Sequence, residues 1–220
     1  MKPVEITVRG SHAVTLPPEQ ATVYAQVSAD GAEPQPVFDA VATALAAVTT
    51  SLQARHHPKD GPVTKFVIDQ IRRGSHHPFN RDGEQLPLVH TASVPIIATF
   101  ADFDDLAAWA GWTAGVPGLG IGYIEWALTD ATRLRAERKT RQKAVRDARR
   151  RAQDYADALD LGTVTVRTIS DPGMGVGPAH RKVMMASAVG DSTTGPPEVS
   201  LRPDDVHIEA QVEATFTVRG

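Results

Sequence analysis

The sequence predicts an α+β fold: a mostly antiparallel, twisted sheet with two main helices packed on one face. Three observations support this fold. Residues 206–220 alternate apolar and polar side chains almost without error, a pattern typical of a long strand with one buried and one wet face. Residues 37–52 and 130–161 each read as a helix, and 37–52 repeats apolar side chains at helical spacing. Because the apolar side of the sheet needs a cover, we expect both helices to pack there.

The remaining elements follow in chain order, with turns marked by glycine, proline, asparagine and aspartate. Apolar alternation and these turn signals predict strands at 6–16 (bent at Gly10), 21–29, 64–73, 88–100, 123–129 and 164–169, a short helix at 103–113, and a glycine-rich loop at 115–122.

The long helix is expected to start at Asp130 as its N-cap and to stop at Gly162,. Residues 171–200 collect glycine, proline, serine and methionine without periodicity. Such a segment has too little apolar content to offset its ordering entropy, so we expect a mobile loop there.

Composition limits the classes of function. The chain has 220 residues, enough to enclose a substantial core, and we expect a single domain over 1–220,. Its formal net charge of -3 argues against a wholesale polyanion binder,. Because cysteine is absent, disulfides, thiol chemistry and cysteine-ligated zinc are excluded.

The ends and apolar runs bear on location. The first strand starts within a few residues of Met1, with no apolar leader ahead of it,. No apolar run approaches the roughly 18 to 20 residues of a membrane span. We therefore expect a cytoplasmic protein without a membrane span.

Several segments together resemble the SIMPL domain family. They are the opening Ile6-Thr7-Val8-Arg9-Gly10-Ser11, then residues 18–23 (Pro-Glu-Gln-Ala-Thr-Val), the alanine-rich helix from Ala144 to Gly162, and the terminal strand from Val206 to Val218. Their order and spacing carry the resemblance, which covers essentially the whole chain. Where relatives commonly carry Pro-Gly before the last strand, this chain has Pro203-Asp204-Asp205.

The resemblance implies an α+β fold, a tendency to form homo-oligomers, and links to envelope stress or to signalling scaffolds. It supplies no catalytic residues. We therefore expect a protein that is not an enzyme and that needs neither a cofactor nor a metal.

A basic stripe on the long helix is the main candidate site. Between Arg133 and Arg151 the chain has ten Lys or Arg residues against Glu137 and Asp147. Helical spacing places five of these cations in one stripe, which could meet an acidic protein or phosphates. The basic stripe consists of Arg135, Lys139, Lys143, Arg146 and Arg150.

The same helix has a second unusual feature. An apolar face runs through its C-terminal half and is made of Val145, Ala148, Ala152, Tyr155, Ala156 and Leu159. In the first turns that face is taken by Glu137, Arg138 and Arg141. Those first turns are therefore expected to project into solvent, or to meet a partner or a second copy of the chain.

Other motifs favour structural roles. Neighbouring residues on an extended chain point to opposite faces, so the His56-His57 and His76-His77 pairs are poor chelators,. The glycine runs at 115–122 and 173–177 match neither a Walker sequence nor a dinucleotide-binding turn. The Ser11-His12, Asp104-Asp105 and Asp204-Asp205 neighbours form no recognisable triad,.

The sequence thus favours a non-catalytic scaffold or oligomerising module that binds an unidentified protein partner through the basic stripe, with the 171–200 loop as a second candidate surface. The alternative is an anionic-ligand or nucleic-acid binder that uses helix residues 133–151. We disfavour nucleic acid because no aromatic side chain for base stacking accompanies the stripe,.

Overall fold

The computed structural model describes residues 3–81, 85–171, 183–184 and 201–218. Contacts divide the chain into two compact units. Unit 1 takes its residues from 1–18, 128–179 and 204–220, and unit 2 takes the others. The single domain expected over 1–220 stays a prediction.

The sheet of unit 1 has the strand order β1-β9-β7, and both pairings are antiparallel. Its strands are β1 (Val4–Leu16), β7 (Thr165–Ser170) and β9 (Val206–Val218). The central strand β9 alternates as the sequence predicts: Ala210, Val212, Ala214, Phe216 and Val218 are buried, and the residues between them are partly exposed. The two-faced terminal strand is confirmed.

Helix α3 (Asp130–Ala158) covers the apolar face of β1 and β9 with a ladder of small side chains. Every fourth residue from Ala136 to Ala156 is buried, so the N-terminal half of the helix also packs on the sheet from Ala136 onward. Of the predicted apolar face, Ala148, Ala152 and Ala156 are buried, but its large members Val145, Tyr155 and Leu159 are exposed. The buried residues are Ala136, Thr140, Ala144, Ala148, Ala152 and Ala156.

Gly10 explains why the ladder is made of small residues. A Cβ atom at Gly10 would lie 2.2 Å from the backbone oxygen of Ala144 and 2.4 Å from the backbone nitrogen of Ala148. The helix backbone therefore lies almost directly on the strand, and only glycine fits at that contact. β1 continues through Gly10 as one strand.

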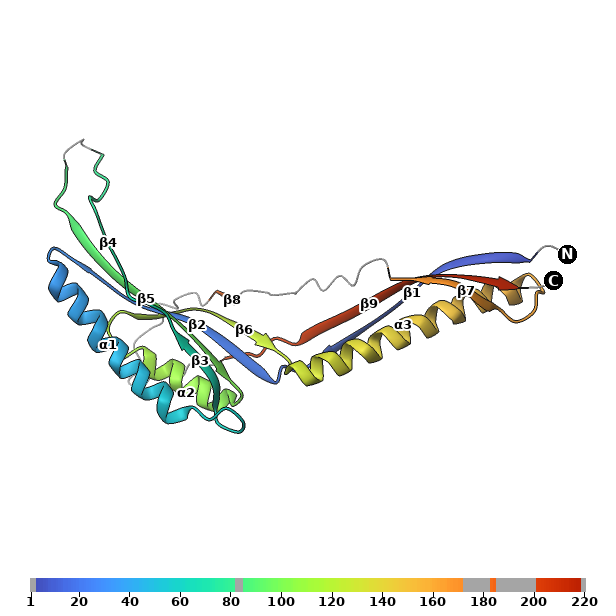
Figure 1. The fold of residues 1–220 in the computed structure, drawn as a ribbon, viewed down its shortest axis with the longest axis horizontal. Helices are drawn as coiled ribbons and strands as arrows, with labels where there is room; N and C mark the ends of the chain where they lie inside the picture. The colour runs from blue at the N-terminus through green and yellow to red at the C-terminus, as the bar shows by residue number, and fades with distance from the viewer. Residues whose placement is uncertain (1–2, 82–84, 172–182, 185–200, 219–220) are drawn as a thin grey trace. The chain divides into compact units, whose positions relative to one another are not determined.

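Unit 2 contains a second antiparallel sheet, with the order β3-β5-β2-β6-β8 and with β4 also paired to β5. Figure 1 shows α1 and α2 on one side of this sheet. The elements of unit 2 are β2 (Gln20–Gly31), α1 (Pro34–Arg55), β3 (Val63–Ile68), β4 (Arg72–His76), β5 (Val89–Phe100), α2 (Phe103–Thr113), β6 (Leu119–Ala127) and β8 (Val183–Met184).

Helix α1 buries one apolar stripe against this sheet. Val41, Val48 and Leu52 are fully buried and share a core with Phe100 and Trp109. By length and composition α1 is apolar enough to cross a membrane, but the core helix of a soluble protein passes the same test.

The α+β class and the antiparallel pairing are confirmed, but the two main helices do not share a sheet. α1 packs on β2 and β5, whereas α3 packs on β1 and β9, and no described pairing joins the two sheets. Alternation in a sequence identifies the buried face of a strand but does not identify the neighbouring strand, so the sequence could not separate the sheets.

Three element boundaries differ from the prediction. The strand expected at 64–73 is split, because Asp69 accepts a hydrogen bond from the backbone of Gln70 (2.8 Å) and turns the chain. β6 begins at Leu119, within the expected loop. α3 has its N-cap at Thr129 and ends before Asp160, a residue with positive φ (52°), so Gly162 is not its stop.

Candidate functional site

All five residues of the basic stripe are exposed on α3. Successive members are three or four residues apart, so the helix places them in one row. At about 1.5 Å per residue the row from Arg135 to Arg150 is about 22 Å long. The structure therefore brings together the residues that the sequence singled out.

The two ends of the stripe have polar partners on the same helix. Arg135 donates to the hydroxyl of Thr132 (2.8 Å), and Arg150 pairs with Asp147. Lys139, Lys143 and Arg146 form the centre, and no residue in the described part of the chain forms an ion pair with them. The centre of the stripe thus presents three cations to solvent.

Asp147 has a structural role in this helix. Its side chain is only 12% exposed and accepts a hydrogen bond from the backbone nitrogen of Ser11 in β1 (3.1 Å). It also pairs with Arg151 (2.9 Å) and Arg150. The carboxylate therefore fixes α3 to the edge of the sheet and orients two arginines beside it.

The chemistry of the centre is that of an anion-binding surface. Exposed Lys and Arg side chains on one helix row repel one another, and a partner that carries carboxylates or phosphates relieves this repulsion. Tyr155 is 60% exposed, but helical geometry places it on the side of α3 opposite Arg146,. No aromatic ring therefore joins the stripe, as the sequence predicted.

Sequence reasoning missed an apolar surface in unit 1. Val166 and Ile169 of the edge strand β7 are 59% and 53% exposed. They pair with Phe216 and Ala214, both buried, so they belong to the sheet face that α3 covers elsewhere. The covering helix contacts β1 and β9, and the apolar side of β7 stays open to solvent.

The histidine pairs have separate local partners. His57 pairs with Asp60, and the His77 ring nitrogen Nδ1 lies 2.8 Å from the carbonyl oxygen of Leu86. The ring of His56 stands edge-on to Phe66 at 5.2 Å. Within the described ranges no three potential ligands gather.

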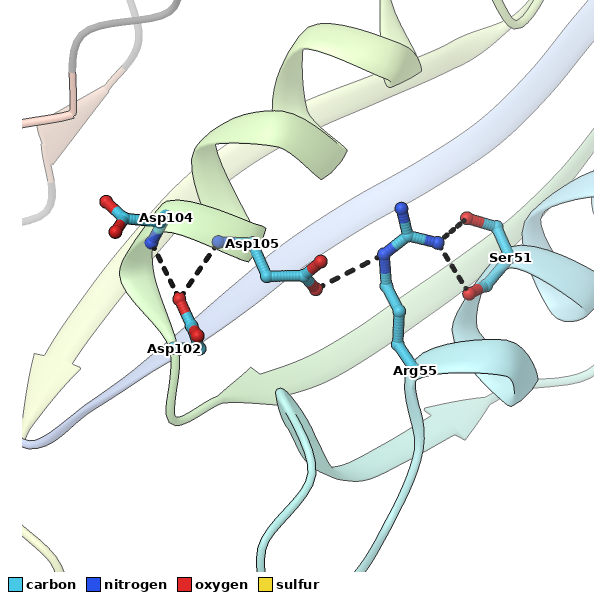
Figure 2. A network of polar contacts seen from close by, with 5 residues as sticks. All are labelled: Ser51, Arg55, Asp102, Asp104 and Asp105. Carbon is cyan, nitrogen blue, oxygen red and sulfur yellow. Dashed lines mark hydrogen bonds and ion pairs between the residues drawn. The ribbon is translucent and has the colours of Figure 1, made fainter.

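The aspartates at 102–105 stabilise the start of α2. Figure 2 shows the Asp102 carboxylate accepting from the backbone nitrogens of Asp104 (2.9 Å) and Asp105 (3.0 Å). The Asp105 carboxylate lies 3.2 Å from Nε of Arg55 at the end of α1, and that arginine also donates to Ser51. This network joins two helices of unit 2.

Two predicted features lie wholly or mostly outside the described residues: the loop at 171–200 and the glycine run at 173–177. Met184 belongs to the short strand β8. Asp204 and Asp205 are exposed and precede β9.

Comparison with known proteins identifies the family. A search of curated proteins finds no match. The family model described as SIMPL, protein of unknown function (DUF541), matches residues 6–216 and so covers nearly the whole chain. The matched range includes Gly10, the alanine ladder and β9 as far as Phe216, the features that build unit 1. The chain therefore belongs to the SIMPL (DUF541) family.

Proposed function

We propose that the chain is a non-catalytic interaction module that binds an acidic protein surface through the basic stripe of α3. The supporting observation is that α3 packs with one face and presents its cations on another. Its buried face is a continuous ladder of alanines and one threonine, while the cations of the stripe are all exposed. No cation of the stripe is needed to hold the helix on its sheet.

A protein partner suits this surface better than a nucleic acid. The stripe lacks an aromatic side chain on which bases could stack. A cytoplasmic location, a homo-oligomeric state and a link to stress stay predictions.

Charge reversal tests the proposal with poly-L-glutamate as the acidic probe. We expect Lys139→Glu/Lys143→Glu to weaken binding by about tenfold or more, because two favourable charge contacts become repulsive. The matched control is Arg138→Glu/Arg149→Glu, which makes the same charge change on exposed residues of α3 outside the stripe. Fluorescence anisotropy with a labelled polymer measures both affinities.

Two outcomes contradict the proposal. Equal weakening by both double variants would show attraction to overall charge without a defined stripe. Tighter binding to duplex DNA than to poly-L-glutamate, with a steep loss on adding salt, would favour the nucleic-acid alternative.

A further inference from the structure

Strand β1 has one free edge. Among the described strands it pairs only with β9, in an unbroken antiparallel register. Ser11 donates its backbone N–H to the Asp147 carboxylate of α3 (3.1 Å), so this N–H points away from β9. Because the backbone groups of successive residues in a strand point in opposite directions, those of Ala13 and Thr15 point away from β9 as well. We call residues 11–16 the open edge.

Helix α3 runs antiparallel to β1. Its middle crosses Gly10, where a Cβ atom would meet the backbone of Ala144 and Ala148. Glu19 donates its backbone N–H to the Ala127 carbonyl oxygen (2.9 Å), which brings the start of α3 near the end of β1. Figure 1 shows the helix lying along the strand. The part of α3 before Ala144 therefore lies beside the open edge.

The two flanks of α3 face different strands. Asp147 immediately precedes a residue of the alanine ladder and reaches Ser11 of β1. Gln153 immediately follows a ladder residue and accepts a hydrogen bond from the backbone nitrogen of Val164 (3.1 Å), just before β7. Residues that precede ladder members therefore lie on the β1 side of the helix. From 135 to 151 this flank row consists of Arg135, Lys139, Lys143, Asp147 and Arg151.

The flank row is cationic beside the open edge. Arg135, Lys139 and Lys143 are exposed, and within the described ranges the two lysines form no ion pair. Asp147 is the row's one acid, and its carboxylate takes the N–H of Ser11. It therefore ends the open edge on that side, while the backbone groups of Ala13 and Thr15 lie next to the three cations.

The spacing of the flank row matches that of a strand. Four residues of a helix advance by about 6 Å, and two residues of a strand advance by about 6.6 Å. Alternate side chains of a strand point to the same face of its sheet. A strand added to the open edge would therefore place every second side chain, on the α3 face, next to successive cations of the row.

We propose that an acidic segment of a partner protein binds in extended conformation as an added strand on the open edge. Carboxylates at every second position meet Arg135, Lys139 and Lys143, and main-chain hydrogen bonds to Ala13 and Thr15 fix the register. The inference rests on the proposed function, because it specifies how the first three residues of the basic stripe bind an acidic protein.

Two peptides of equal composition and charge test the spacing. The alternating peptide is Thr-Glu-Thr-Glu-Thr-Glu-Thr, and the block peptide is Thr-Thr-Glu-Glu-Glu-Thr-Thr. We expect the alternating peptide to bind about fivefold more tightly or better, because successive glutamates cannot all lie on the α3 face of a strand. Fluorescence anisotropy with labelled peptides measures both affinities.

Backbone methylation tests the main-chain pairing. Two versions of the alternating peptide carry N-methyl groups, one on its three glutamates and the other on its last three threonines. Successive amides of an added strand point alternately toward β1 and toward solvent, so we expect one version to lose binding and the other to keep it. The version that loses binding shows whether the added strand is parallel or antiparallel to β1. Equal affinities of the two versions would overturn the proposal.

A proline at the open edge tests the same contact from the side of the protein. Ala13→Pro removes one outward N–H and should weaken the alternating peptide about tenfold while leaving the block peptide unchanged. Ala13→Ser keeps the N–H and is the matched control. Circular dichroism checks that both variants fold; if Ala13→Pro does not fold, the methylated peptides test the pairing on the unaltered protein.

The outcomes separate this inference from the proposed function. Equal affinities of the alternating and block peptides, or binding of poly-L-glutamate without binding of the alternating peptide, would overturn the inference and leave the proposed function standing. Binding of none of the three probes would overturn both. Peptide affinity that falls as the protein concentration rises would mean that a second copy occupies the edge, and would overturn the inference.

Discussion

At the scale of single residues, two positions have contacts on which local packing depends. Gly10 allows α3 to lie against β1, and Tyr24 connects a stacked ring pair to Glu125 through its hydroxyl (3.1 Å). The contact at Gly10 depends on the absence of a side chain, and the contact of Tyr24 depends on the orientation of its ring. Each leads to a measurable expectation.

Gly10→Ala should lower the free energy of unfolding by about 1–3 kcal/mol, because the new methyl group overlaps the backbone of Ala144 and Ala148,. Gly120→Ala is the matched control, since its Cβ enters open space. Urea unfolding followed by circular dichroism compares the two. Equal stability of the two variants would contradict the close packing of α3.

Burial, helped by the hydrogen bond to Glu125, raises the pKa of Tyr24 from 10.0 to about 12. Above pH 10 the unfolded chain loses this proton while the folded chain keeps it, so stability falls as the pH rises from 10 to 12 and is unaffected below pH 10. Absorbance at 295 nm follows the phenolates.

The chain has three tyrosines, and we expect one of them to titrate last. Glu125→Gln should lower the pKa of that group only in part, because burial is its largest cause. An unchanged titration curve in Glu125→Gln would contradict the assignment to Tyr24.

At the scale of elements, α3 shows why helical periodicity can mislead. The predicted face combined the alanines at 148, 152 and 156, which are buried, with Val145, Tyr155 and Leu159, which are exposed, so only its smallest side chains pack. Close approach of two backbones selects small residues, because a bulky side chain would push the helix away from the strand. Hydrophobicity alone cannot show this preference.

Helix α2 depends on its first residue outside the helix. Asp102→Ala removes an acceptor for two backbone nitrogens and should lower the free energy of unfolding by about 1 kcal/mol,. Asp104→Ala keeps the cap and removes an exposed carboxylate in the first turn, so its loss should be clearly smaller,. Thermal unfolding measures both; equal losses would contradict the capping role.

At the scale of the whole molecule, each unit has its own apolar core. The core of unit 1 contains Phe216 and the alanines of α3, and that of unit 2 contains Phe100 and Trp109. The chain enters unit 2 after β1 and returns to unit 1 with α3. The order in which the parts of the chain unfold should therefore follow the division into two cores.

Amide hydrogen exchange tests whether the cores respond separately. Phe216→Ala should speed exchange in β1 and β9, and Phe100→Ala should speed exchange in β2 and β5, because each change leaves a cavity in one core. The two variants control each other. Faster exchange throughout the chain in both variants would contradict separate cores.

Much of the fold could be predicted from the sequence, because its elements carry local signals. The alternation in β9 and the helical spacing in α1 each identified an element and its buried face. The basic stripe was also predictable, since charges on one helix need only helical geometry.

Other features depend on contacts between distant residues. The pairing of β1 with β9 joins residues some 200 positions apart, and the stacking of Tyr24 on Tyr123 requires β2 and β6 in register. Nothing in the sequence marks Phe79 as exposed, because its 88% exposure follows from the β4 hairpin, which extends away from the core. Single-sequence periodicity contains no information on such neighbours.

β5 is a single strand of twelve residues with two environments. Val94 and Phe100 lie in the core between β2 and β3, while residues 89–93 pair with β4. The covalent backbone is continuous between the two regions. One backbone therefore couples the β4 hairpin to the core of unit 2, so a displacement of the hairpin is felt first at the strand that the core surrounds.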